Sequence, residues 1–472
     1  MKFPYENINE SVRKILNSIA ELSAEKKINT YLIGGYVRDV LLDRKNTDID
    51  LCVEGDAVAF AEDCAKHFNK KLDAVYKRFG TALLNFDELK IEFASARKES
   101  YSHDSRKPII EFTSIKDDLS RRDFTINALA VELNNPDKVI DNFNGLDDLK
   151  NKIIRTPLDP KKTFDDDPLR MMRAARFASQ LNFTIDEITL NAAKEMRERV
   201  NDGSGVVSQE RITDEFLKIL KTDKPSVGLD ILFKTGLMEI VFKEVSNLQG
   251  VEQRKDYHHK DVFYHTLEVV DNISKMTDNI WLRFTALVHD IAKPPTKKFI
   301  EGIGWTFHGH EELGARWQKK IFTRMKLPFE HLPYVEKLVR LHLRPIALAD
   351  ENVTDSAIRR LLFDAGEYID DLLTLCRADI TSKDPKKVKK YIANFDIVEK
   401  RIAEVEERDK IKSFQSPVRG EEIMKICNLE PSKKVGELKK MIEEAILDGE
   451  IPNEYDAALK YLHSIKDNVL SK

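Results

Sequence analysis

The sequence is poor in the features that mark secreted and membrane proteins. Its four cysteines are widely scattered and show neither a metal-binding spacing nor a disulfide pattern. No apolar run approaches the roughly 18 residues of a membrane helix, and no signal-peptide core lies near the start. The net charge is −4, so a nucleic-acid partner would have to meet local basic patches. These absences predict a cytoplasmic protein with no membrane partner, and no protein partner is evident.

What the chain does have is length and charge. Its 472 residues exceed what one hydrophobic core supports, so about three to four compact units are expected. Apolar spacing predicts an opening helix over residues 8–22, and strand signals nearly vanish beyond residue 147. The polar stretch 96–107 is predicted to be a loop. The fold class is therefore α+β, a small mixed-sheet head on a long all-helical body. The head is expected to hold strands at 31–33, 49–53, 81–86 and 90–93, and a helix at 57–68.

The most informative motif couples a glycine turn to a pair of aspartates. Gly34 and Gly35 lead from an apolar strand into a helix that carries Arg38, and Asp48 and Asp50 follow on a second strand. Side chains two residues apart on a strand point to one face, so both carboxylates can bind one hard cation. Mg²⁺ usually takes one or two protein carboxylates and keeps its other positions for water and substrate phosphates. Because glycines at a helix start and an arginine suit a phosphate, the motif predicts a metal–triphosphate site rather than a mere tight turn.

Two arginine-rich blocks accompany this motif. Arg121-Arg122-Asp123 lies beside an apolar run and, taken alone, could be a capped helix with a surface ion pair. The block 166–177 has acidic residues and a proline where a helix would begin, and both suit a first helical turn. An exposed ion-paired helix would leave the even spacing of its arginines unexplained. Residues three apart share a helix face, and the residues so spaced here are Asp167, Arg170, Arg173 and, at the edge, Arg176.

Together these motifs resemble those of the class II tRNA nucleotidyltransferase and poly(A) polymerase family, whose catalytic core is shared with DNA polymerase beta. The resemblance implies Mg²⁺ on Asp48 and Asp50, with either Glu92 or Asp123 as a third carboxylate. It implies that Gly35, Arg38 and Arg122 contact the incoming triphosphate.

The same resemblance assigns the helical block to base selection. Asp167 only accepts hydrogen bonds and Arg170 only donates them, so together they can match the edges of C or A. Arg173 and Arg176 would reach the phosphates or orient this protein template. The chain has Asp166 where the CCA-adding pattern usually has Glu, which leaves CCA, CC-only, A-only and poly(A) synthesis open. Two further stretches resemble family motifs of the head–neck region, Asp141 with Gly145 and Glu210-Arg211 with Glu215.

A second constellation lies in the helical body. Four histidines and two aspartates follow one another in the order of an HD phosphohydrolase domain. Mixed imidazole and carboxylate ligands suit a divalent transition metal such as Mn²⁺, Ni²⁺, Fe²⁺ or Zn²⁺. The domain could hydrolyse phosphate or cyclic-phosphate RNA ends, or be retained for structure. The expected ligands are His265, His289, Asp290, His310, His342 and Asp379.

The sequence therefore predicts a template-independent nucleotidyltransferase that adds C, C and A to the tRNA acceptor end from CTP and ATP and releases pyrophosphate. A poly(A) polymerase and a partial, CC-only or A-only enzyme are alternatives of the same class. An HD phosphohydrolase whose head merely binds nucleotide is the alternative from another class. The expected parts are a nucleotidyltransferase head (1–150), a helical neck (151–225), an HD-type domain (226–385) and a helical RNA-binding tail (386–472). Candidate basic patches are Lys383, Lys386, Lys387, Lys389 and Lys390, and the pairs Lys433-Lys434 and Lys439-Lys440.

Overall fold

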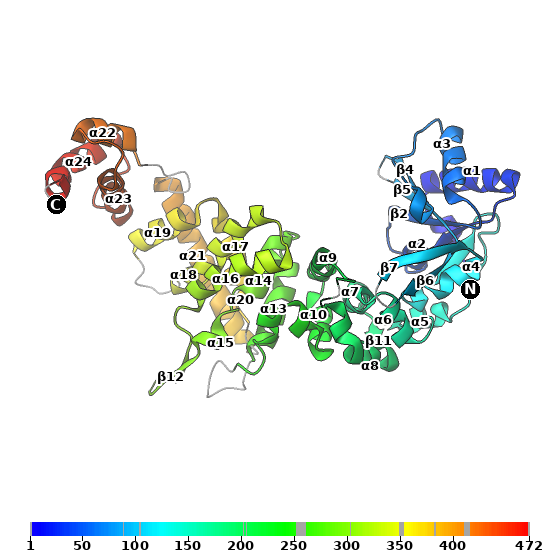
Figure 1. Cartoon of the computed structure of the whole chain (residues 1–472). Helices are drawn as coiled ribbons and strands as arrows, with labels where there is room; N and C mark the ends of the chain where they lie inside the picture. Colours follow the sequence, from blue (N-terminus) through cyan, green and yellow to red (C-terminus); the bar gives the residue numbers. More distant parts are fainter. Residues whose placement is uncertain are drawn as a thin grey trace. The chain divides into compact units, whose positions relative to one another are not determined.

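The chain folds into two compact units, Met1–Lys243 and Glu244–Lys472 (Figure 1). Among the described helices, none combines the length and apolar character needed to cross a bilayer. The computed structural model describes residues 2–87, 89–102, 105–201, 203, 205–251, 261–302, 304–348, 354–381, 384–409 and 416–470, without the side chains of 98–102, 105–112, 385 and 387.

A seven-stranded mixed sheet forms the centre of the first unit. Its strand order is β3-β4-β5-β2-β1-β8-β9, and β2 runs parallel to β5 while the other neighbours are antiparallel. This arrangement confirms the mixed-sheet head, and each of the four predicted strands is present. The strands are β1 (Thr30–Ile33), β2 (Asp48–Val53), β3 (Ala74–Tyr76), β4 (Thr81–Phe86), β5 (Leu89–Ser95), β8 (Leu129–Glu132) and β9 (Val139–Asp141).

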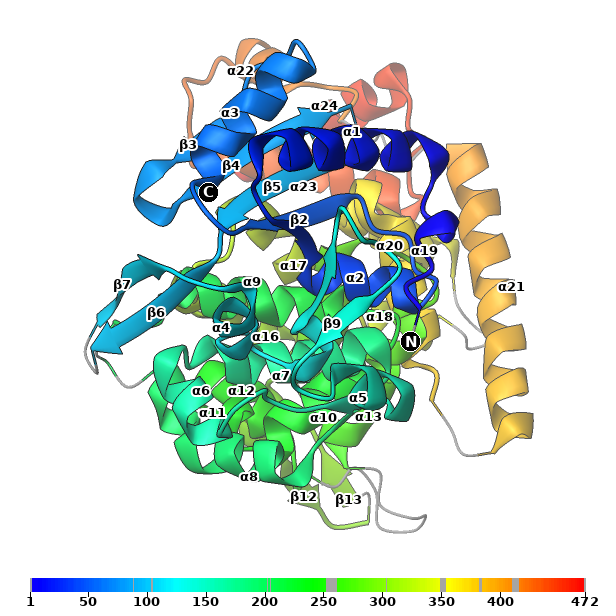
Figure 2. The same ribbon diagram turned by 90° about the vertical axis from the view of Figure 1, so that its right-hand side faces the viewer.

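The two faces of this sheet have different roles. Helices α1 (Glu10–Lys26) and α3 (Ala57–His67) cover one face, where Leu16, Phe60 and Leu51 join one buried cluster (Figure 2). Side chains alternate along β2, so Asp48, Asp50 and Cys52 point to the opposite face. There Cys52 packs with the apolar side of α4 (Ile115–Ser120). The alternation therefore directs both aspartates away from the main core.

The predicted loop over residues 96–107 is wrong. Strands β6 (Arg97–Ser102) and β7 (Ser105–Phe112) form an antiparallel hairpin, with a register shift between Ser100 and Ser102. This hairpin is a separate two-stranded sheet outside the seven-stranded one. Strand pairing is made by backbone groups, and the polar stretch offers no apolar alternation from which to predict it, so no strand signal was visible.

Further helices complete the first unit. Helix α7 packs against α9 and α10, and Phe177 of α7 meets Phe124 of the head edge to face at 5.8 Å (Figure 1). This contact joins the arginine-bearing helix to the head within one unit. The helices are α2 (Gly34–Leu41), α5 (Gly145–Asn151), α6 (Pro160–Asp166), α7 (Leu169–Leu181), α8 (Glu187–Met196), α9 (Gln209–Leu220), α10 (Pro225–Lys234) and α11 (Leu237–Val241).

The second unit is almost wholly helical, as predicted for the body. One short hairpin, β12 (Lys298–Ile300) and β13 (Gly304–Thr306), interrupts it. Helices α22, α23 and α24 share a separate buried cluster at the end of the chain. The longer helices are α13 (Val262–Ser274), α14 (Ile280–Val288), α16 (His310–Met325), α17 (Leu332–Leu341), α19 (Asp355–Ala365), α20 (Ile369–Asp379), α21 (Pro385–Asp409), α22 (Gly420–Cys427), α23 (Lys433–Asp448) and α24 (Tyr455–Leu470).

Candidate functional sites

Three carboxylates meet at the centre of the head sheet. Asp50 of β2 lies opposite Glu92 in the parallel register of β5, and Asp48 precedes it by two residues on the same face. Burial raises the pKa of Asp50 to about 6, against the opposing effect of Arg122 and with help from Glu92 and Asp48. Clustered carboxylates of this kind suit a divalent cation, because its charge offsets their repulsion and oxygen is the ligand that Mg²⁺ prefers.

The glycine turn brings the backbone close to these carboxylates. Gly34 begins α2 with a φ of 69°, a left-handed conformation that glycine adopts without strain. A Cβ at this position would lie 3.0 Å from Arg122 Nη1 and 3.5 Å from Asp50 Oδ2. The missing side chain therefore leaves room for a ligand group between the turn, the arginine and the aspartate.

Arg122 faces this space from the opposite side. Its Nη2 donates to Asp118 Oδ2 at 3.0 Å, while Arg121 Nη2 donates to Asp118 Oδ1 at 2.6 Å. Burial raises the pKa of Asp118, but the two guanidinium groups outweigh burial and lower it overall. Arg122 Nε is buried without a hydrogen-bond partner in the described part of the chain. Arg122 is thus fixed by Asp118 and keeps one N–H group without a described hydrogen-bond partner.

Arg38 is anchored within the protein. Its Nε and Nη2 lie 2.9 and 2.7 Å from Asp39 Oδ1, and its Nη1 donates to Asn127 Oδ1 at 2.7 Å. The residue is 3% exposed, and its guanidinium lies 5.2 Å from the centre of the Phe177 ring. Its charge is therefore held under the glycine turn by two neighbours.

Asp123 is engaged by a different group of residues. Arg173 Nε and Nη2 donate to its Oδ2 at 2.9 and 2.5 Å, and Asn127 Nδ2 donates to Oδ1 at 3.0 Å. Burial raises the pKa of Asp123, but Arg173 and Asn127 outweigh it and hold the pKa well below its usual range. Both oxygens of this carboxylate are therefore committed to protein donors.

Arg176 lies one turn after Arg173 on α7 and is also held by a carboxylate. Its Nε donates to the buried carboxylate of Glu215 on α9 at 2.6 Å, and its guanidinium covers the Phe177 ring at 4.2 Å. Arg173 Nη1 also lies 3.9 Å from Glu215. The two arginines thus tie α7 to the head on one side and to α9 on the other.

Asp167 and Arg170 lie at the start of α7. Asp167 Oδ1 accepts from the Leu169 N–H at 3.2 Å, and its Oδ2 lies 3.4 Å from Arg211 Nη2. Arg170 Nη2 donates to the backbone carbonyl of Arg121 at 2.7 Å, and its Nη1 donates to that of Thr163 at 3.3 Å. These bonds orient Arg170 against the block that carries Arg122.

Most of the predicted site residues line one hollow of about 410 Å³ in the first unit. Glu92, Asp167 and Arg170 are not among its lining residues, although each is linked to one of them by strand register or sequence. Residues that the sequence did not single out, Lys45, Asn46, Asn127 and Gln180, also line it. Asn127 lies four residues after Asp123 of the first arginine block, whereas Asn46 follows an apolar helix without any motif. The predicted residues in the hollow are Gly35, Arg38, Asp48, Asp50, Arg122, Asp123, Arg173 and Arg176.

The six predicted HD ligands come together in two groups within the second unit. His265, His289 and Asp379 form one, and Asp290, His310 and His342 form the other. His289 Nε2 lies 3.3 Å from Asp290 Oδ2, while His310 Nε2 lies 3.3 Å from Asp290 Oδ1. The two oxygens of Asp290 therefore face different groups, as in a carboxylate that bridges two ions.

Each of these histidines has its Nδ1 held by a neighbour. Carbonyl oxygens lie 2.7–2.8 Å from Nδ1 of His289, His310 and His342, and Thr381 Oγ1 lies 2.8 Å from Nδ1 of His265. Such bonds orient the rings and leave Nε2 for a metal. His265 Nε2 lies 2.9 Å and His289 Nε2 3.5 Å from Asp379 Oδ1, so these buried donor atoms converge on one point. The donor set therefore fits a divalent transition metal.

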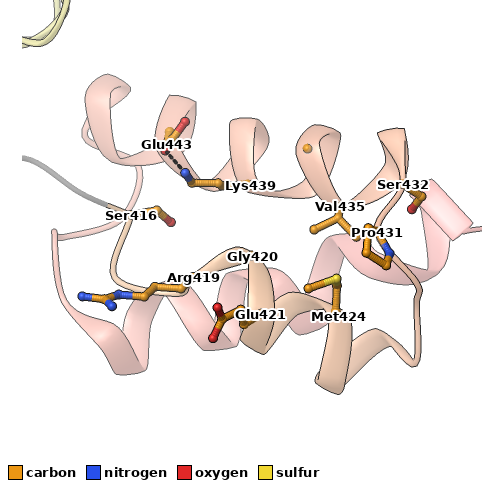
Figure 3. Close-up of a pocket in the computed structure, with 11 residues that line it drawn as sticks. Ser416, Arg419, Gly420, Glu421, Met424, Pro431, Ser432, Val435, Lys439 and Glu443 are labelled. Carbon is orange, nitrogen blue, oxygen red and sulfur yellow. Dashed lines mark ion pairs between the residues drawn. The ribbon is translucent and has the colours of Figure 1, made fainter.

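The tail has a hollow of about 660 Å³ between α22 and α23 (Figure 3). Lys439 on its wall lies 3.7 Å from Glu443, and Lys434 Nζ donates to the Leu470 carbonyl at 3.0 Å. Part of the predicted basic surface is therefore paired within the tail. Lys383 and the side chain of Lys387 lie outside the described residues.

Family models match three consecutive parts of the chain. Residues 30–155 match the poly(A) polymerase head domain, and residues 182–248 match the probable RNA and SrmB-binding site of polymerase A. Residues 262–384 match the HD domain. The matches cover the three carboxylates of the head and all six residues of the histidine–aspartate cluster, while Arg173 and Arg176 of the hollow lie between the first two matches.

Individual relatives support the same relationship. The multifunctional CCA protein of Shewanella frigidimarina is 32% identical over 375 residues, which are 75% of this chain and 84% of that protein. The A-adding tRNA nucleotidyltransferase of Aquifex aeolicus is 34% identical over 63% of this chain, and the chain spans 34% of that longer protein. A structure of a CCA-adding enzyme in its apo form II covers 97% of each chain with a TM-score of 0.64 at 23% identity, which shows the fold.

Proposed function

Because the chain belongs to the tRNA nucleotidyltransferase and poly(A) polymerase family, we propose that it is a CCA-adding enzyme. It would add C, C and A to the tRNA acceptor end from CTP and ATP without a nucleic-acid template. The observation that carries the proposal is the set of three carboxylates, Asp48, Asp50 and Glu92, beside the turn at Gly34. We place the reaction in the cytoplasm, where the four cysteines would stay reduced.

We propose that Asp48 and Asp50 hold Mg²⁺ and that Glu92 is the third carboxylate. The alternative, Asp123, has both oxygens committed to Arg173, Asn127 and its neighbouring N–H. Bound Mg²⁺ would polarise the α-phosphate and lower the pKa of the RNA 3′-hydroxyl for in-line attack, with pyrophosphate leaving.

Around this metal site, the chain would hold the triphosphate by backbone and charge. The backbone at Gly34 and Gly35 can approach phosphate oxygens, and Arg122 has donor capacity left for them. Arg38 would add positive charge from beneath the turn. Asp167 and Arg170 would read the base edge, while Arg173 and Arg176 hold α7 in place through Asp123 and Glu215.

The test is an extension assay with tRNA transcripts that end before CCA, after C and after CC. CTP and ATP are supplied separately and together, and the products are sequenced. Ordered addition that stops at CCA is the expected result. Addition of A only to ends that already carry CC would identify an A-adding enzyme, and an unbounded A tract would identify a poly(A) polymerase. No extension by a folded protein would overturn the proposal.

We also propose that the HD domain is a phosphohydrolase site for a phosphate or cyclic phosphate at an RNA end. Six inward-facing ligands with oriented imidazoles support this activity more than a purely structural role. The test compares phosphate release from 3′-phosphate and 2′,3′-cyclic-phosphate RNA by wild-type protein and Asp290→Ala with added Mn²⁺ or Ni²⁺. Equal phosphate release by the wild-type protein and Asp290→Ala would show that the HD cluster does not catalyse this hydrolysis.

The tail would contact the RNA by charge and A-form shape rather than by sequence. Arg419 and Lys439 on the wall of its hollow are basic groups of suitable chemistry. Deletion of residues 416–472 should then weaken tRNA binding in a salt-dependent manner and leave incorporation into a short RNA unchanged.

A further inference from the structure

Asn46 makes two hydrogen bonds that connect the glycine-turn helix to the carboxylate strand. It lies in the connection between α2 and β2, two residues before Asp48. Its Oδ1 accepts from the Asp48 N–H at 2.9 Å, and its Nδ2 donates to Asp39 Oδ2 at 2.9 Å. One amide therefore holds both the first residue of β2 and a buried residue of α2.

Asp39 is itself a rigid anchor. It is 7% exposed, and its other oxygen, Oδ1, accepts from Arg38 Nε at 2.9 Å. Arg38 in turn donates to Asn127, and Asn127 donates to Asp123. Asn46 is thus the outer end of a continuous hydrogen-bonded series that begins in the buried part of the site.

Asp48 needs such support because it is an exposed first residue of its strand. The Thr47 carbonyl before it accepts from the Lys90 N–H of β5 at 3.0 Å, whereas the N–H of Asp48 itself is held by Asn46 Oδ1. Asp50 is held differently, since it lies within the strand between paired neighbours. The position of Asp48 relative to Asp50 therefore depends on what fixes the backbone at residue 48.

We propose that Asn46 is a positioning residue that sets the Asp48 carboxylate for divalent metal binding. The inference rests on the proposed function for the identity of the metal site. Asn46 is not one of the residues of this sequence that match the family motif. Only an amide of this length both accepts from the N–H and donates to a carboxylate; an aspartate would accept only and would place two carboxylates together.

The test measures Mn²⁺ binding to the full chain by electron paramagnetic resonance, in the absence of RNA and CTP and on a His289→Ala, Asp290→Ala background. Asn46→Ala should weaken binding at the carboxylate site by about tenfold or more, as loss of outer partners of metal ligands does. Asn46→Asp keeps the acceptor and loses the donor, so it should also weaken binding. Asn9→Ala is the matched control, because Asn9 Oδ1 accepts from Ser11 N–H at 2.9 Å in the same turn geometry away from the carboxylates.

Extension assays give the second readout. The Mg²⁺ concentration for half-maximal rate should rise by about the same factor in Asn46→Ala, while the KM for CTP at saturating Mg²⁺ stays within about twofold. Wild-type Mn²⁺ affinity in Asn46→Ala would overturn the proposal, as would a loss that only follows the unfolded fraction seen by circular dichroism. Because Mn²⁺ binding is read without substrate, a wild-type protein that fails to extend tRNA overturns the proposed function and still leaves this inference testable.

Discussion

Asp50 and Glu92 occupy paired positions on the parallel strands β2 and β5. Their strands are far apart in sequence order, yet the register places both carboxylates on the face that Asp48 shares. Burial raises the pKa of Asp50 to about 6, with Glu92 and Asp48 adding to the rise, while Arg122 offsets part of it. Burial is the largest cause of this rise, so the site disfavours an ionised Asp50 and a divalent cation would stabilise it.

Glu92 and Asp123 give a direct comparison of the two candidate carboxylates. Glu92→Gln should lower metal-dependent nucleotide addition by roughly 100-fold without a loss of stability, because this carboxylate is exposed and faces Asp50. Asp123→Asn should instead cost about 3 kcal/mol of stability, since it removes the carboxylate that accepts two hydrogen bonds from Arg173 and leaves that arginine only Glu215, at 3.9 Å, as an ion-pair partner among the described residues. Urea unfolding and initial rates distinguish the two. The assignment fails if Glu92→Gln keeps its activity and a folded Asp123→Asn loses it.

The pKa of Asp50 predicts how the metal-free protein responds to pH. The folded pKa of about 6 exceeds the ordinary value of 3.8, so between these values the folded state binds more protons than the unfolded state. Ionisation of Asp50 therefore lowers stability as pH rises through this window, and the full penalty remains above pH 6.

Asp50→Asn should remove this penalty and abolish nucleotide addition. After allowance for partial exposure, we expect a gain of about 1–2 kcal/mol at pH 8 in EDTA and none near pH 3.5. Thermal unfolding of both proteins across this range provides the measurement. A constant difference at every pH would show that Asp50 does not titrate in the window.

Local patterns in the sequence predicted those helices, strands and helix faces that depend on residues close together in the chain. Alternation around Asp48 and Asp50 predicted the strand β2 and the face that carries its aspartates. The three-residue spacing of the arginines predicted that they share one face of α7. Pairings between distant residues could not be read in this way. Arg38 and Asn127 are 89 positions apart, and Arg173 and Asp123 are 50 apart, so only the folded chain reveals that these pairs are joined by hydrogen bonds.

The same limit applies to the cluster in the second unit. Its six residues were found by their order, but their division around Asp290 depends on which oxygen faces which ring. Asn46 gave no signal, because asparagines are frequent in connections and its partner Asp39 lies on another element. The hairpin β6–β7 was missed because its pairing is made by backbone groups and the polar stretch 96–107 shows no apolar alternation.

Gly145 should not tolerate a side chain. A Cβ there would overlap the Thr125 carbonyl oxygen and lie 2.9 Å from Leu129 Cδ2, and a backbone carbonyl cannot move aside cheaply. Gly145→Ala should lower stability by about 2–3 kcal/mol. Gly436→Ala is the control, because it lies within α23 with nothing within 4 Å of the added carbon, and should stabilise by about 0.5–1 kcal/mol. Equal effects in urea unfolding would contradict the predicted clash.

Metal binding at the histidine–aspartate cluster should stabilise the second unit. A ligand present at 100 times its dissociation constant adds about 2.7 kcal/mol when it binds only the folded state. Mn²⁺ or Ni²⁺ should therefore raise the unfolding temperature of an Asp48→Ala, Asp50→Ala protein, and EDTA should reverse the rise. His289→Ala should abolish the response, because this ring has a buried Nε2 directed at Asp290 and Asp379.

His463→Ala provides the control for this experiment, since His463 is an exposed histidine on α24 of the same unit. It should respond to the metals as the parent protein does. Two bound ions per chain are expected by calorimetry, because each oxygen of Asp290 faces a separate group of donors. A stoichiometry of one would mean that the two groups enclose a single ion, and an unchanged response in His289→Ala would move the metal away from this cluster altogether.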